Sequence, residues 1–193
     1  VLPGTPTTLR SLLTRSPLLI FGGCILLFHL SNAAMLPLMG SVLTTRLSDW
    51  ATVLIAACMV GPQLVVAVFS PWVGRRAQQW GRRPLLIAAF AVVPIRAILF
   101  ATVHDPYLLV AVQLFDGLTA SVFSVLVPLT IADLTRGTGR FNLAQGMVGT
   151  MTGIGASLSP TLAGYVTDTY DSSAAFLSLA AVAALGFTAV TLL

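Results

Sequence analysis

Three ionisable side chains lie within long apolar stretches of the sequence: His29, Arg96 and Asp116. Each holds a charge or strong hydrogen bonds, and each is costly if it faces lipid hydrocarbon. If these stretches cross a membrane, such residues indicate either a structural ion pair or a path for protons and polar substrates. The chemistry to look for is therefore charge pairing and proton transfer inside a bilayer.

Arg96 and Asp116 are expected to lie at similar depths. Arg96 comes twelve residues after Pro84, where an apolar stretch begins, which places it about 18 Å deep at about 1.5 Å per residue. By the same arithmetic Asp116 lies about 15 Å from the opposite face. In a hydrocarbon core of about 30 Å these depths agree within roughly 3 Å. We predict an ion pair between adjacent antiparallel helices, with two roles open: a structural pin, or a switch coupled to protons or substrate.

The elements that must hold these residues are membrane-spanning helices. The chain is 56% hydrophobic and 8% charged and contains neither lysine nor glutamate, which would leave a soluble domain too little polar surface. A helix needs about 20 apolar residues to cross a bilayer. The predicted spans are 17–39, 51–73, 84–103, 107–131, 143–166 and 173–193. We predict an all-α polytopic membrane helix bundle of six transmembrane helices over residues 17–193, preceded by a cytoplasmic linker over residues 1–16.

The arginines predict how the bundle is oriented. If the spans alternate in direction, eight of the ten arginines fall on one side, against Arg46 on the other and Arg96 within a span. The positive-inside rule places the arginine-rich side and both chain ends in the cytoplasm. We expect a multi-pass protein of a prokaryotic cytoplasmic (inner) membrane. Nucleic acid is not an expected partner, because the basic loop of about ten residues offers only Trp80 as an aromatic platform.

A weak internal repeat has an offset of 90 residues. The positions that correspond are Gly74 with Gly164, Gln78 with Asp168, and Gly81 with Asp171. These pairs divide the chain into two units of three helices each. Because three is an odd number, the second unit must enter the membrane from the opposite face. We therefore predict a 3+3 inverted repeat, an arrangement that is common in secondary transporters.

The stretch between the second and third predicted spans resembles a signature of the major facilitator superfamily of transporters, G-x3-D-[RK]-x-G-[RK]-[RK]. The matching residues are Gly74, Gly81, Arg82 and Arg83. Gln78 and Gln79 stand where the pattern has an acidic and a basic residue. This eroded form is similar to the second copy of the signature. The resemblance implies helices seven to twelve of a twelve-helix transporter, partnered by a second six-helix half in the same full-length chain or in a homodimer mate.

The resemblance also implies roles for two groups of residues. The cytoplasmic gate loop would consist of Gly74, Gln78, Gly81, Arg82 and Arg83, with the arginines bound to carboxylates and carbonyls. Gln78 carries no charge, so any ion pairing that holds this face of the transporter closed would be weakened. The alternative is that the arginines only fix the orientation of the helices in the membrane. The first helix of each unit would line a central cavity. The candidates there for the substrate or proton pathway are His29, Asn32, Gln113 and Asp116; a histidine tied to a neighbouring helix is the alternative for His29.

The fifth predicted span is rich in small residues. Gly149 and Gly153 are four residues apart and are followed by Pro160 and Gly164. Small residues at such a spacing allow helices to approach closely, so we expect these positions to serve helix packing. A loose similarity to a glycine- and proline-rich antiporter signature is a weak indication of efflux.

An enzyme is not expected. An intramembrane serine protease needs a serine in a Gly-x-Ser-Gly setting and a later histidine, whereas Ser157 is followed by Leu158 and no histidine follows His104. Cys24 and Cys58 are interpreted as small packing residues, and neither a metal nor a cofactor is expected. We predict a transporter that works by alternating access in the lipid bilayer, with proton-coupled efflux of a small-molecule substrate (a drug or metabolite) favoured. The alternatives are a symporter that imports a sugar or organic acid and a non-transporting receptor or assembly subunit.

Overall fold

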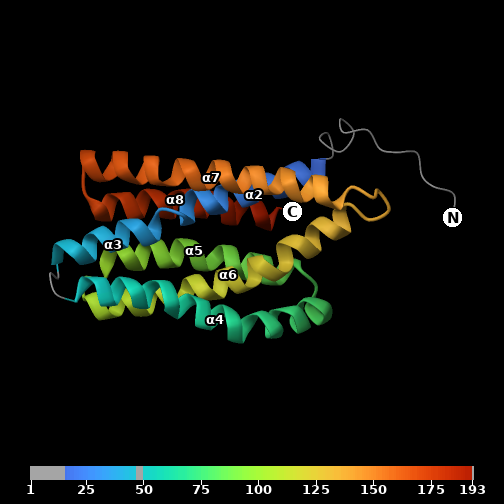
Figure 1. The fold of residues 1–193 in the computed structure, drawn as a ribbon. Coiled ribbons are helices and arrows are strands. Elements are labelled where there is room, and N and C mark those ends of the chain that lie inside the picture. The colour runs from blue at the N-terminus through green and yellow to red at the C-terminus, as the bar shows by residue number, and fades with distance from the viewer. Residues whose placement is uncertain (1–15, 47–49, 193) are drawn as a thin grey trace.

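The computed structural model describes residues 16–46 and 50–192, and these residues form helices joined by short connections (Figure 1). The helices are α2 (Ser16–Asn32), α3 (Met35–Arg46), α4 (Ala51–Trp80), α5 (Arg83–Thr102), α6 (Pro106–Leu134), α7 (Phe141–Thr169) and α8 (Ser172–Thr191). The all-α bundle predicted from the sequence is confirmed. Of the linker expected over residues 1–16, only Ser16 belongs to the described residues.

Five segments of the described chain are long and apolar enough to cross a membrane: Ser16–Thr45, Ala51–Trp80, Arg83–Thr102, Pro106–Leu134 and Ser172–Thr191. The first of these contains both α2 and α3. Helix α7 does not join this set although it has 29 residues. Glycine, serine and threonine make up much of its sequence and lower its hydropathy. It nevertheless runs alongside α2 and α8, so it belongs to the same bundle (Figure 1).

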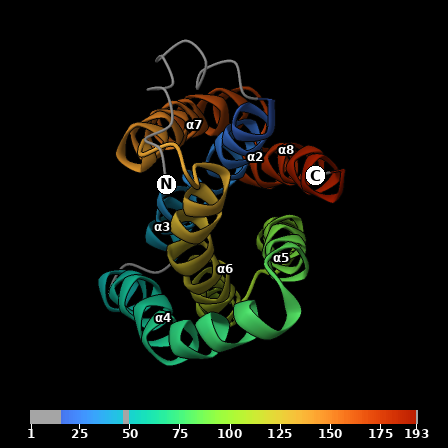
Figure 2. The ribbon, with the colours of Figure 1, turned by 90° about the vertical axis from the view of Figure 1, so that its right-hand side faces the viewer.

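Helices of the first predicted repeat (α2 with α3, α4 and α5) pack mainly against helices of the second (α6, α7 and α8). If α2 and α3 together count as one helix, the first helix of each repeat packs against the second helix of the other, as α2 does with α7 and α6 with α4. The third helices, α5 and α8, pack against each other. Seen along the bundle, α7, α2 and α8 lie on one side and α4 on the opposite side, with α6 and α5 between them (Figure 2). This exchange of equivalent partners agrees with the predicted repeat of three helices, and its inverted orientation stays a prediction.

Two glycines permit the closest approaches between the repeats. A Cβ atom added at Gly117 in α6 would lie 2.5 Å from the Pro62 carbonyl oxygen in α4, and one added at Gly155 in α7 would lie 2.4 Å from the Leu26 carbonyl oxygen in α2. Both distances are too short for a real side chain. Each of the two exchanged helix pairs therefore contains a position that only glycine fills without a shift.

The glycines singled out from the sequence do not make these contacts. A Cβ at Gly149, Gly153 or Gly164 would meet nothing within 4 Å among the described residues. Within the described bundle these glycines bring no helices together, because they lie on the exposed side of α7; their role in helix packing stays a prediction. Pro160 is exposed as well and lies inside the continuous helix α7. The contact with α2 is made by the opposite side, through Gly155.

The first membrane-crossing segment is broken at Ala33 and Ala34, between α2 and α3. Pro37 has no N–H to donate to the carbonyl of Ala33, which interrupts the helical hydrogen bonds at this point. The Ala34 N–H donates instead to the Ser159 hydroxyl of α7, at 2.9 Å. Ser159 is fully buried. A neighbouring helix thus satisfies a backbone group that could not remain unpaired in lipid.

A cluster of three phenylalanines fills the centre of the bundle. Phe28 of α2 stacks on Phe123 of α6 with ring centroids 3.8 Å apart, and Phe90 of α5 lies 5.6 Å and 5.4 Å from these two rings. Asn32, Asp116 and Arg96 lie on the same three helices, farther from the arginine-rich end. The aromatic cluster therefore separates the polar residues from that end of the bundle.

Candidate functional site: a polar network between three helices

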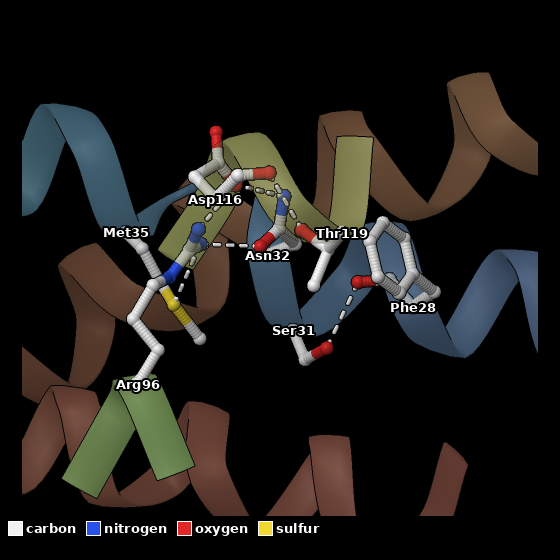
Figure 3. A network of polar contacts seen from close by, with 7 residues as sticks. All are labelled: Phe28, Ser31, Asn32, Met35, Arg96, Asp116 and Thr119. Atoms are coloured by element: carbon white, nitrogen blue, oxygen red, sulfur yellow. Dashed lines mark hydrogen bonds and ion pairs between the residues drawn. The ribbon is translucent and has the colours of Figure 1, made fainter. Parts of the chain in front are cut away.

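Arg96 is the central residue of the network. Its side chain is 2% exposed, and its guanidinium reaches from α5 towards α2 and α6 (Figure 3). Nη1 forms an ion pair with Asp116 Oδ1. Nη2 donates to Asn32 Oδ1 and lies 3.1 Å from Met35 Sδ. Arg96 and Asp116, which were expected to lie at similar depths in the membrane, therefore form an ion pair in the structure.

Asn32 closes the network into a ring of contacts. Its Nδ2 donates to Asp116 Oδ1 at 3.4 Å, while its Oδ1 accepts from Arg96. Each of these three residues therefore contacts the other two, and each comes from a different helix. The Asp116 side chain is 27% exposed, so the network is accessible from one side only. A proton or a polar group of a ligand can reach the carboxylate but not the guanidinium.

Arg96 also spans the break in the first segment. Asn32 is the last residue of α2 and Met35 is the first residue of α3, and the same guanidinium nitrogen contacts both. The orientation of α3 relative to α2 is thereby linked to the ion pair with Asp116.

Two buried polar atoms close to this site have no hydrogen-bond partner among the described residues: Arg96 Nε and Gln113 Oε1. Gln113 is 1% exposed and lies one turn before Asp116 on α6. Buried polar atoms are nearly always paired, so unpaired ones mark strain or a place where water or a ligand group binds. Gln113 thus adds to the polar interior without facing the accessible side.

His29 does not join this network. Its ring lies edge-on to that of Phe28 at 5.2 Å, and its Cβ lies beside Gly155 of α7. No hydrogen bond connects His29 with Asn32 within the described residues. The predicted unit of His29 and Asn32 is therefore divided: Asn32 faces α5 and α6, whereas His29 lies at the contact between α2 and α7.

The connection between α4 and α5 is much shorter than expected. Helix α4 continues to Trp80, so Gly74 and Gln78 are helical and only Gly81 and Arg82 lie between the helices. The predicted loop of about ten residues is wrong, because polar residues such as arginine and glutamine extend a helix readily beyond the hydrocarbon. Gly81 then adopts φ 80°, which glycine tolerates best.

The two arginines at this turn contact the ends of two other helices. Arg82 forms an ion pair with Asp133 and donates to the carbonyl of Leu129, both in α6. Arg83 Nη2 donates to the carbonyl of Thr191 in α8 at 2.8 Å. Positive groups are favourable at helix C-termini, where carbonyls lack partners. The turn is thus attached to α6 and α8 at the arginine-rich end.

The geometry is that of a polytopic bundle with a buried charge pair, and a comparison with known families decides its class. Residues 12–193 match the family model described as Major Facilitator Superfamily. The chain belongs to the Major Facilitator Superfamily. Membership indicates a multi-pass protein of the lipid bilayer from a family of transporters.

Curated members of the superfamily are similar to this chain over part of their length. Two uncharacterized MFS-type transporters, each from a strain of Mycobacterium tuberculosis, are 43% identical over 182 residues, which is 94% of this chain and 44% of each relative. The class B tetracycline resistance protein of Escherichia coli is 26% identical over 115 residues, or 60% of this chain and 28% of that protein. The chain thus spans less than half the length of these relatives. No solved structure matches it significantly.

Three contacts of this superfamily member were not anticipated from the sequence. Ser159 binds the broken segment, Met35 contacts Arg96, and Asp133 pairs with Arg82. The pairing of Asp133 could have been predicted from the sequence, because Asp133 is a carboxylate close in sequence to Arg136 and Arg140. The contacts of Ser159 and Met35 could not, because both are residue types that are ordinary in apolar helices.

Proposed function

We propose that this chain forms one six-helix half of a transporter that exports a small molecule in exchange for protons. Transport would proceed by rocking of this half against a second one. The observation that carries the proposal is Asp116, a partly exposed carboxylate deep in α6 that is paired with the buried guanidinium of Arg96.

The ion pair provides a chemical route for coupling. An arginine side chain keeps its charge in proteins, so only Asp116 can change charge within the pair. A proton on Asp116 removes the charge that neutralises Arg96, and an unpaired buried charge is strongly unfavourable. The favourable response is a movement of α5 and α6 relative to α2. Because Asn32 and Met35 contact the same guanidinium, this movement would also change the angle between α2 and α3.

The second half is supported by the length of the relatives and by an exposed surface on α7. This chain covers 44% of the mycobacterial proteins, which leaves room there for another unit of similar size. Gly149, Gly153 and Gly164 form an exposed row of small residues on α7 with no neighbour within 4 Å of an added Cβ. Rows of this kind allow close helix approach in membranes. This side of α7 is the surface that we assign to the second half.

Export is favoured over import by two observations. The relative from Escherichia coli is named for tetracycline resistance. Many hydroxyl groups in the spans donate to carbonyls of their own helix, as those of Thr119, Ser121 and Ser157 do, and so have no donor left for a sugar oxygen. An apolar or amphipathic substrate suits such walls better than a polyhydroxylated one.

Asp116→Asn tests the coupling in the full-length protein. In everted membrane vesicles that contain the wild type, a proton gradient should drive accumulation of tetracycline, used as the probe. The Asn variant should lose this gradient dependence. Asp168→Asn, which removes an exposed carboxylate near the end of α7, is the matched control and should retain it. Absence of proton-driven movement in the wild type, or a probe that moves with protons into cells, would contradict export.

The structural alternative has a distinct signature. If Asp116→Asn lowers the thermal stability but leaves transport and its pH dependence unchanged, the pair is only a pin between helices and proton coupling through Asp116 is refuted.

A further inference from the structure

Helices α4 and α5 are joined by two residues yet diverge from each other, and a cavity of about 350 Å³ lies between them. We call it the α4–α5 cleft. Its walls are formed by side chains of α4, α5 and α6, among them Phe69, Trp72, Trp80, Leu85, Ala88 and Val122. Its lining includes Trp80 and Pro84, so it lies near the end of the bundle where α4 ends and α5 begins.

The walls of this cleft are almost entirely apolar. Thr119 and Ser121 border it, but their hydroxyls donate to the carbonyls of Asp116 and Leu118 at 2.8 Å and 2.7 Å. The other lining side chains are apolar. Because these two hydroxyls have no donor left and the other walls are apolar, hydrocarbon is the occupant that suits the cleft best.

A cation stands at the mouth of the cleft. The Arg76 guanidinium lies over the Trp80 ring at 4.7 Å and over the Trp72 ring at 5.7 Å, and Nη1 donates to Gln79 Oε1 at 2.9 Å. Both indoles also line the cleft. Arg76 has no ion pair within the described residues. Asp133, the acidic residue described at this end, is paired with Arg82 and Arg136.

The depth of these groups matches that of a lipid. The apolar stretch 51–73 of α4 is long enough to cross a hydrocarbon core of about 30 Å, so the following residues, including Arg76, lie at the level of the headgroups. Tryptophan is enriched at this level. From Pro84 to Val92 the cleft descends eight residues along α5, about 12 Å into the hydrocarbon. A phosphate at the mouth would thus be joined to an alkyl chain within.

We propose that the α4–α5 cleft binds an anionic phospholipid of the leaflet on the arginine-rich side, with the upper part of an acyl chain between the helices and the phosphate on Arg76. The apolar walls favour the acyl chain of the lipid, and the Arg76 guanidinium, which has no ion pair within the described residues, favours a negatively charged headgroup. This proposal does not depend on proton coupling through Asp116.

Photocrosslinking in the full-length protein tests the site. The protein is reconstituted into phosphatidylcholine nanodiscs that contain either a photoactivatable phosphatidylglycerol or a photoactivatable phosphatidylcholine, and labelled peptides are mapped by mass spectrometry. Phosphatidylglycerol should label residues 69–92 about fivefold more than phosphatidylcholine, the factor expected for one arginine near a membrane surface. Arg76→Gln should abolish this preference. Arg75→Gln removes the same charge from the neighbouring, exposed position and should retain it.

A second pair of variants tests occupancy of the cleft. Ala88 is exposed to the cleft, so Ala88→Trp fills it without displacing the core and should prevent labelling by both lipids. Ile95→Trp places the same ring on another exposed position of α5 and should label as the wild type does. Thermal unfolding confirms that each variant is folded. Wild-type labelling in Ala88→Trp, no labelling of the wild type, or equal effects of Arg76→Gln and Arg75→Gln would each overturn the proposal.

Discussion

Asn32 and Met35 lie on opposite sides of the break between α2 and α3, and one nitrogen of the Arg96 guanidinium contacts both. A backbone break in lipid is normally stabilised by satisfying its free N–H and C=O groups. Here Ser159 satisfies the backbone, while Arg96 connects the side chains before and after the break. The conformation of the first segment therefore depends on residues from three other helices, α5, α6 and α7.

Arg96→Met should destabilise the protein by about 3–5 kcal/mol, because it leaves the Asp116 carboxylate without its partner inside the membrane. The double variant Arg96→Met with Asp116→Leu should recover much of this loss, since no unpaired charge remains. Thermal unfolding of the full-length protein in detergent measures both. Additive losses in the double variant would show that the two residues are not energetically coupled.

Ser159→Ala should cost about 1–3 kcal/mol, because the buried Ala34 N–H then has no acceptor. Ser157→Ala, two residues earlier on α7, is the matched control. The Ser157 hydroxyl is exposed and donates to the Ile154 carbonyl of its own helix, so its loss should change stability by less than about 0.5 kcal/mol. Equal unfolding temperatures for the two variants would mean that Ser159 does not stabilise the break.

Gly155→Ala should destabilise the bundle, because the new methyl group would collide with the backbone of α2. Overpacking of this kind typically costs about 1–3 kcal/mol. Gly74→Ala should have the opposite effect and stabilise by about 0.5–1 kcal/mol, since Gly74 is helical and has open space around it. The unfolding temperatures of the two variants should thus lie on opposite sides of that of the wild type. A destabilising Gly74→Ala would instead indicate that the second half packs on this residue.

Cysteine labelling should place the arginine-rich end in the cytoplasm. In intact cells a membrane-impermeant thiol reagent should modify Tyr170→Cys, at the turn between α7 and α8, but not Thr138→Cys, in the connection between α6 and α7. In everted vesicles the two reactivities should be exchanged. The native Cys24 and Cys58 are 2% and 1% exposed and should contribute little background. The reverse pattern in intact cells would invert the topology that the arginines predict.

Much of the fold follows from the sequence because helix length and rise are nearly fixed. The depths of Arg96 and Asp116 could be calculated from position alone, and the connection of only three residues between α5 and α6 leaves these helices adjacent and antiparallel. Asn32 could not be added to the pair in this way. Its direction depends on the rotation of α2 and on the break at Ala33 and Ala34, which are set by packing against α7.

The end of α4 and the side of α7 that packs within this bundle were both hard to predict, for one physical reason. The hydropathy pattern ends near Val73, but a helix continues as long as its backbone is paired, so α4 reaches Trp80. The spacing of Gly149 and Gly153 fits close packing on any helix face, whereas the face that packs is decided by the neighbours of the whole helix. Both features depend on more than the local residue types.

Arg96 and Asp116 are only 20 residues apart, on the two arms of the hairpin formed by α5 and α6. At synthesis rates of about 5–20 residues per second, the second charge leaves the ribosome about 1–4 seconds after the first. The two arms can therefore enter the bilayer together as an electrically neutral unit. An arginine that would hinder insertion of a single helix thus becomes tolerable through the order of translation, before α7 and α8 have been synthesised.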